Sequence, residues 1–131
     1  MSAVFGIDAH NAETFLSRGF VCVDKASEKA EIAMKVFRSI RTEDVIFIKD
    51  FSPQAGLTIK AAGIALSSYP AEINSEVCIP VEWVWRGKKL IDEFDEKCSH
   101  CGDLLYEEHN IMVQREIIEL IPDKLQLPIE W

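Results

Sequence analysis

The stretch that most constrains the fold spans residues 42–66, where two short apolar runs flank a cluster of turn-forming residues. Residues 45–48 are β-branched or aromatic, residues 52–56 include proline and glycine, and residues 57–64 form the second run. This order predicts a β-hairpin with a loop of about five residues. Neither run alternates cleanly between apolar and polar side chains. This indicates two strands covered on both faces, as in a small barrel or under a packed helix.

Lys49 and Lys60 are the basic residues of these two strands, and they flank Phe51 near the loop. A cation beside an exposed aromatic ring at the end of a strand can hold a planar, anionic ligand. The alternative is that Phe51 closes the core and both lysines are solvated strand ends. The hairpin alone favours this alternative, because aromatic side chains pack more often than they bind ligands.

The rest of the chain alternates between short strands and helices. Residues 32–40 carry apolar side chains at spacings of three and four, which is typical of an amphipathic helix packed on a sheet. Asn11 and Asn110 are predicted helix caps, and Gly19 ends the first helix. The predicted strands are 3–7, 20–23, 77–85 and 104–106, with an edge strand in 124–131, and the predicted helices are 12–18, 27–40 and 111–121.

The strand predicted at 77–85 contains two tryptophans. Its period of two places Val81, Trp83 and Trp85 on one face. Either one tryptophan fills the core while the other lies under the last helix, or one lines a pocket with Phe51 or Tyr69. Pro80 has no amide donor, so it belongs at an edge, a bulge or the start of the strand.

Length and charge limit the class of protein. The 131 residues predict a single domain, 1–131, with a core of ordinary size. We expect a cytoplasmic protein, because no apolar run is long enough for a membrane helix and no signal peptide is readable. The net charge of −8 argues against broad binding to phosphates. The acidic excess is concentrated in the C-terminal third of the chain. Residues 1–85 carry 8 basic and 11 acidic side chains, whereas residues 86–131 carry 6 basic and 11 acidic side chains.

The four cysteines are expected to be reduced thiols in a cytoplasmic protein, rather than a disulfide framework. Cys22 is predicted to be a small buried hydrophobe. Cys98 and Cys101 have the spacing of a zinc knuckle, which would need further ligands from His100, His109, Cys78, Cys22 or a second chain. Chance pairing of the two cysteines in a surface hairpin is the favoured interpretation, so no metal or cofactor is predicted.

Catalytic motifs are absent from the sequence. There is no glycine-rich phosphate loop, no H-E-x-x-H and no nucleophile elbow, and His10 and His109 are isolated. We therefore expect a domain that is not an enzyme.

Several segments together carry a resemblance to a known family. They are residues 4–6, 15–20, 40–49, 57–65, 81–83 and 102–108. Their order resembles the EVE-like division of the PUA-like domains, particularly the N-terminal domains of McrB-type, modification-dependent restriction proteins. The resemblance implies an α+β fold in which a small, bent, mixed β-barrel of about five to six strands is flanked by two to three helices.

The resemblance also implies binding to DNA or RNA that contains modified bases, with a flipped base in an aromatic pocket and any effector protein encoded separately. Stacking contributes roughly 1–3 kcal/mol per base, and a carboxylate or amide reads the base edge. Glu43 stands where a glycine is usual, which predicts a different turn before Asp44. By position, the pocket would be lined by Asp8, Asn11, Lys49, Asp50, Phe51, and Trp83 or Trp85, with Lys60 added from the hairpin.

A second hypothesis is a protein-interaction module. Its aromatic surface, its acidic C-terminal third and Trp131 would then bind a partner protein. The net negative charge favours this function over a general nucleic-acid binder.

Overall fold

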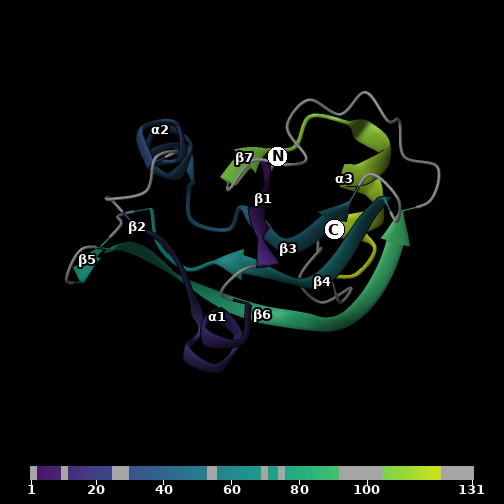
Figure 1. Cartoon of the computed structure of the whole chain (residues 1–131), viewed down its shortest axis with the longest axis horizontal. Coiled ribbons are helices and arrows are strands. Elements are labelled where there is room, and N and C mark those ends of the chain that lie inside the picture. Colours follow the sequence, from purple (N-terminus) through teal and green to yellow (C-terminus); the bar gives the residue numbers. More distant parts are fainter. Residues whose placement is uncertain are drawn as a thin grey trace, which may run out of the picture.

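The computed structural model describes residues 3–9, 12–24, 30–52, 56–68, 71–73, 76–91 and 105–121. The fold is mixed α+β, as predicted, with three helices around one strongly curled sheet (Figure 1). In chain order the elements are β1 (Val4–Asp8), α1 (Ala12–Arg18), β2 (Phe20–Asp24), α2 (Ala30–Ser39), β3 (Val45–Ser52), β4 (Gly56–Ala65), β5 (Ala71–Ile73), β6 (Glu76–Ile91), β7 (Leu105–Glu107) and α3 (Ile111–Ile118).

The sheet has the strand order β2-β6-β4-β3-β1-β7, and the short β5 pairs with β6. Strands β1 and β3 are parallel, whereas the other pairs are antiparallel. Because β2 and β7 stand at the two ends of the series, the described strands form a curled half-barrel. The predicted number of strands is therefore confirmed, apart from the additional β5.

The predicted hairpin is confirmed as the pair β3–β4, which pairs Phe51 with Leu57. A register shift after Ile48 leaves Lys60 without a directly opposite residue on β3. Both faces of β3 are buried, since Ile46 and Ile48 pack into one hydrophobic cluster and Phe47 packs into another. Burial on two faces is the reason why the sequence does not alternate.

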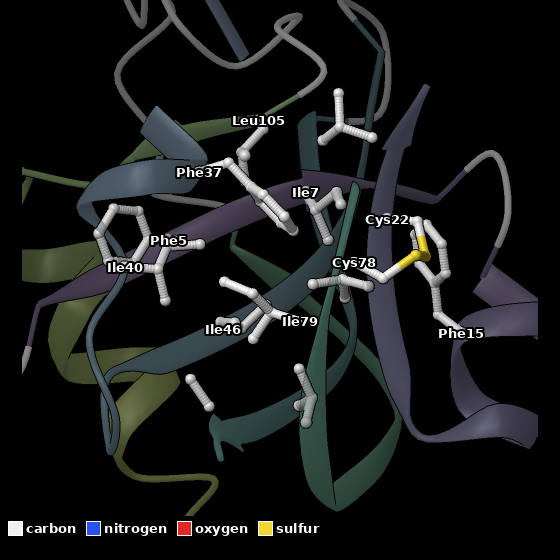
Figure 2. Packing of buried hydrophobic residues seen from close by; sticks show 14 of the residues in the cluster. Phe5, Ile7, Phe15, Cys22, Phe37, Ile40, Ile46, Cys78, Ile79 and Leu105 are labelled. Atoms are coloured by element: carbon white, nitrogen blue, oxygen red, sulfur yellow. A yellow bond between two sulfur atoms is a disulfide. The ribbon is translucent and has the colours of Figure 1, made fainter. Parts of the chain in front are cut away.

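The two clusters lie on opposite faces of the central strands. The first core, shown in Figure 2, includes Phe15 of α1 and Phe37 of α2. The second core includes Val113 and Ile117 of α3. The buried members of the first core are Phe5, Ile7, Phe15, Val21, Cys22, Val23, Ala33, Phe37, Ile40, Ile46, Ile48, Ala61, Ala65, Val77, Cys78, Ile79, Val81 and Leu105. Those of the second are Val4, Val45, Phe47, Leu57, Ile59, Ala62, Ile91, Tyr106, Val113, Ile117 and Ile121.

The prediction for helix α3 is confirmed at its start. The Asn110 side-chain oxygen accepts hydrogen bonds from the backbone N–H groups of Met112 and Val113, at 2.9 and 3.3 Å. These bonds satisfy two of the donors that a helix leaves unpaired at its first turn. The helix is therefore fixed where its apolar stripe meets the second core.

Strand β6 joins the two halves of the sheet. Residues 76–80 pair with β2, and residues 81–91 pair with β4. Pro80 is the last residue of the β2 ladder, so its missing N–H falls where β6 changes partner. In Figure 1 the strand curves across the whole width of the molecule.

The prediction that Val81, Trp83 and Trp85 share one face is wrong. Gly63 pairs with Trp83 and Ala62 pairs with Trp85, so Val84 is an extra residue in β6. This bulge shifts the alternation by one residue. Trp83 therefore packs against the first core, whereas Val84 and Trp85 pack against the second.

The expectation of reduced thiols is also wrong for two of the four cysteines. Cys22 and Cys78 lie directly opposite each other in the β2–β6 ladder and form a disulfide. Cys22 is buried, as predicted, but it is covalently paired. The expectation of reduced thiols was based on the cellular compartment, which says nothing about strand register. The register of β2 against β6 is what places the two sulfurs side by side.

Several predicted features lie outside the described residues. They are the Asn11 cap, His10, Tyr69, the Cys98–Cys101 pair with His100, and the tail that ends at Trp131. Within the described ranges, no helix has the length and apolar character needed to cross a membrane.

The turn before β3 keeps a left-handed backbone despite Glu43. This residue has φ of 76°, and the described chain contains no other non-glycine residue with a positive φ. The neighbouring Asp44 is buried, and its carboxylate accepts from the N–H groups of Ala3 and Arg41 at 3.1 and 2.7 Å. These bonds help to hold Glu43 in the backbone conformation that a glycine would favour.

Replacing Glu43 by glycine is expected to give a more stable protein than replacing it by alanine. A left-handed residue with a Cβ costs roughly 1–2 kcal/mol, and the added freedom of glycine in the unfolded chain removes about 0.5–1 kcal/mol of that gain. We expect Glu43→Gly to raise the free energy of unfolding in urea by about 0.5–1 kcal/mol relative to Glu43→Ala. The alanine control removes the same side chain but keeps the strain. Equal stability of the two variants would contradict this account.

An ion pair links β6 to α3 and gives the stability a pH dependence. Lys89 Nζ lies 2.8 Å from Glu116 Oε1, and this hydrogen bond, with the Glu116 charge, raises the pKa of Lys89 above its ordinary value of 10.5. The contribution is complete below that ordinary value and is lost as the pH rises through the folded-state pKa.

We expect Glu116→Gln to lower the free energy of unfolding by a few tenths to about 1 kcal/mol at pH 7, because the pair is at the surface. Urea denaturation at a series of pH values should show this difference shrinking as the pH rises above the ordinary lysine pKa of 10.5. A difference that is constant through the alkaline range would rule out Lys89 as its source.

Candidate functional site

The candidate site lies where the parallel strands β1 and β3 end together. Asp8 is the last residue of β1, and its register partner on β3 is Lys49. The Lys49 side chain is only 1% exposed, whereas that of Asp8 is 38% exposed, and Lys49 Nζ lies 3.5 Å from Asp8 Oδ1. A buried ammonium thus sits beneath a carboxylate that solvent can reach.

The floor of this site is formed by Tyr106 of β7. Lys49 Nζ lies 5.6 Å from the centroid of the Tyr106 ring, within the range of a cation–π contact. The same ring meets Phe47 edge to face, with centroids 6.2 Å apart. Its register partner is Gly6, and a Cβ there would lie 2.8 Å from Tyr106 Cζ. Only a residue without a side chain at position 6 therefore leaves room for the Tyr106 ring.

Burial of Lys49 determines what the site can do. A lysine is seldom fully buried unless its charge is compensated. Here the compensation comes from the Asp8 carboxylate and the Tyr106 ring, so the ammonium is fixed and cannot reach a ligand at the surface. The exposed part of the pair is the carboxylate, which accepts hydrogen bonds and is held by a cation behind it.

The structure divides the predicted residues of the hairpin between two faces. Phe51 follows Lys49 by two residues, so it lies on the same face, where it packs partly against the second core. Asp50 is exposed and points to the opposite face. Lys60 is half-buried at the register shift of β4. Asp8, Lys49 and Phe51 therefore share one face of the sheet, and Asp50 lies on the other.

The two tryptophans are placed by packing. The Trp83 indole N–H donates to the Phe15 carbonyl at 2.9 Å, which ties β6 to α1. Trp85 of β6 pairs with Ala62 of β4, and Ala62 pairs with Phe47 of β3. Trp85 is therefore level with Phe47, which is four residues before Phe51 in β3. Trp83 thus packs against the first core, whereas Trp85 and Phe51 both pack against the second.

Sequence reasoning missed Tyr106 and Gly6. Both were assigned to strands, but only the pairing of β1 with β7 shows that they meet. A tyrosine in a three-residue strand gives no sign of its neighbour at the other end of the chain.

Comparison of the sequence with family models and curated proteins gives no relative. No protein-family model matches the sequence, and no curated protein is significantly similar to it. The site is therefore interpreted from its own geometry.

The two members of the Asp8–Lys49 pair should respond differently to substitution. We expect Asp8→Asn to lower the free energy of unfolding by about 1–3 kcal/mol, because the buried ammonium loses its carboxylate. Lys49→Met should lower the free energy of unfolding by less than Asp8→Asn does. The apolar methionine side chain fills the same space, and the half-exposed Asp8 stays hydrated.

Urea denaturation at pH 7 measures both effects, with Asp50→Asn as the control, since it neutralises an exposed carboxylate in β3 next to Lys49. The control should stay within about 0.5 kcal/mol of the native protein. A larger loss for Lys49→Met than for Asp8→Asn would show that the lysine, not the pair, is the important element.

Proposed function

We propose that this chain is a non-catalytic binding domain that recognises nucleic acid by holding a single modified or flipped base at the Asp8 end of the β1–β3 pair. The observation that carries this proposal is the half-exposed Asp8 carboxylate fixed by the buried Lys49. A flipped base is read through hydrogen bonds to its edge and through stacking. Asp8 provides an acceptor for amino and ring N–H groups, and Phe51 is the nearest predicted aromatic on the same face.

The family assignment is the finer part of the proposal. The curled mixed sheet, the three helices and the left-handed residue before Asp44 are the features that support an EVE-like, PUA-like domain. Lys60 and Trp85 would contribute around this pocket, and the resemblance adds Asn11, which lies outside the described residues. Asp50 and Trp83 are left out of the proposed pocket, because they lie on the other face of the sheet.

The charge of the protein agrees with base recognition better than with phosphate binding. With a net charge of −8 and its site lysine buried, the domain neutralises few phosphates. Affinity should therefore change little with salt, because the salt dependence grows with the number of phosphates contacted. The ligand is a modified base in DNA or RNA, and an effector encoded separately would act on the bound nucleic acid.

A protein-interaction module is the second candidate, and α3 provides the observation that favours it. Ile111 is 69% exposed and Met112 is 62% exposed at the start of this helix. Exposed apolar side chains that are close together often mark a protein contact. The aromatic surface expected from the sequence is not the basis for it, because Trp83 and Trp85 are packed against the cores.

Binding is tested by titrating tryptophan fluorescence with canonical and modified nucleosides and with short single-stranded oligonucleotides. We expect saturable binding of a modified base, weakened about tenfold or more by Asp8→Asn, since a buried or oriented hydrogen bond to a charged group contributes about 1.5–3 kcal/mol. Phe51→Ala should also lower the affinity for the same ligand, because the stacking contact is lost.

The matched control is Glu82→Gln, which neutralises an exposed carboxylate in β6. It should bind as the native protein does, and circular dichroism should show each variant folded at the assay temperature. No saturable signal with any of these ligands would reject the base reader. Retention of a partner protein that Ile111→Glu loses would then support the interaction module.

A further inference from the structure

The strand pair β2–β6 carries a second cluster of reactive side chains, which the base reader does not use. Cys22 and Cys78 are opposite each other, and Glu76 lies two residues before Cys78 on the same face of β6. The sulfur and carboxylate oxygen atoms of these three residues all lie within 4.8 Å of one another. Among the described residues, no other group of three metal-binding side chains comes so close.

We infer that Cys22, Cys78 and Glu76 form a redox-gated site for a thiophilic divalent cation, with zinc as the best match. Two thiolates and one carboxylate are ligands that Zn²⁺ accepts, whereas Mg²⁺ and Ca²⁺ prefer oxygen alone. In the disulfide state the sulfurs are bonded to each other and the site is closed. In the dithiol state both sulfurs become ligands.

The fold already brings the ligands close to a coordinating geometry. With Zn–S bonds of about 2.3 Å, two sulfurs at the corners of a tetrahedron are about 3.8 Å apart. Cys22 and Cys78 reach this separation by side-chain rotation, because their Cα atoms are 4.1 Å apart in a paired ladder. Asp24, which pairs with Glu76, places a further carboxylate beside the three.

The surroundings shield the two sulfurs from water. Cys22 is 6% exposed and Cys78 is 4% exposed, and Figure 2 shows their sulfurs beside Phe15. Glu76 is half-buried, so it forms the side of the cluster that reaches solvent. A cation that enters along Glu76 would be held between two shielded thiolates, where competing water is largely excluded.

The chemistry of opening and filling the site balances with a phosphine as reductant. The phosphine attacks one sulfur and releases the other as a thiolate, and water then gives two thiols and a phosphine oxide. Binding of M²⁺ breaks two S–H bonds, forms two S–M bonds and releases two protons. A small-molecule disulfide reverses the sequence, because it takes two electrons from the thiolates and expels the ion.

The test uses Co²⁺ as a spectroscopic substitute for zinc, in the whole 131-residue chain carrying Cys98→Ser and Cys101→Ser. These changes remove the other cysteine pair from the measurement. After anaerobic reduction with the phosphine, we expect one equivalent of Co²⁺ to give a thiolate-to-metal charge-transfer band, which Zn²⁺ then bleaches. Oxidised glutathione should abolish the band in the same sample.

Two variants assign the ligands in that background. Glu76→Gln should weaken Co²⁺ binding by at least about tenfold, an effect seen even for residues that only support a ligand. Glu82→Gln is the matched control and should leave it unchanged. Cys78→Ser should remove the two-thiolate spectrum. If the serine variant does not fold, the oxidised parent protein serves as the metal-free reference.

Two results would overturn the inference. One is the absence of a charge-transfer band when both thiols are shown to be free by titration. The other is a disulfide that the phosphine cannot reduce in the folded protein, because the ion would then have no access. Neither result bears on base recognition at Asp8, which belongs to a different strand pair.

Discussion

Backbone hydrogen bonding along β6 holds the two halves of the sheet together, and the other features depend on it. The strand passes from β2 to β4 at Pro80, and the extra residue Val84 lets it follow the curvature of the sheet. Side chains along the same strand then attach the helices. Trp83 bonds to the carbonyl of Phe15 in α1, and Lys89 pairs with Glu116 in α3. A change of register in β6 would therefore disturb both cores at once.

The candidate site depends on a different pairing, that of β1 with β3. A carboxylate ties these strands at each end. At the start, Asp44 accepts from the backbone N–H of Ala3, and at the end Asp8 meets Lys49. The short strand β1 is thus fixed at both ends, so the position of the exposed Asp8 oxygens is determined by the sheet rather than by a loop. Recognition groups carried by such rigid elements lose little freedom when a ligand binds.

The sequence predicted those features whose signals are local. The hairpin follows from two apolar runs around a turn, and the start of α3 follows from Asn110, which needs only the next three residues. Asp8 and Lys49 were both candidates, although their contact was not foreseen. Features that depend on register were missed or misjudged. A single bulge at Val84 separates Trp83 from Trp85, and strand pairing alone unites Cys22 with Cys78. The residue pattern within a single strand predicts neither the bulge nor the pairing of the two cysteines.

The pairing of β1 with β7 has a consequence for synthesis of the chain. Phe5 pairs with Glu107, whereas the other edge of β1 is covered as soon as β3 is made. The stretch from Ser52, the end of β3, to Glu107, the end of β7, takes the ribosome about 3–11 s at a rate of about 5–20 residues per second. During that interval any β1–β3 pair that forms has one open hydrogen-bonding edge, which is a template for association with another chain. The speed of translation through the later strands, rather than the stability of the finished fold, sets how long this edge is open.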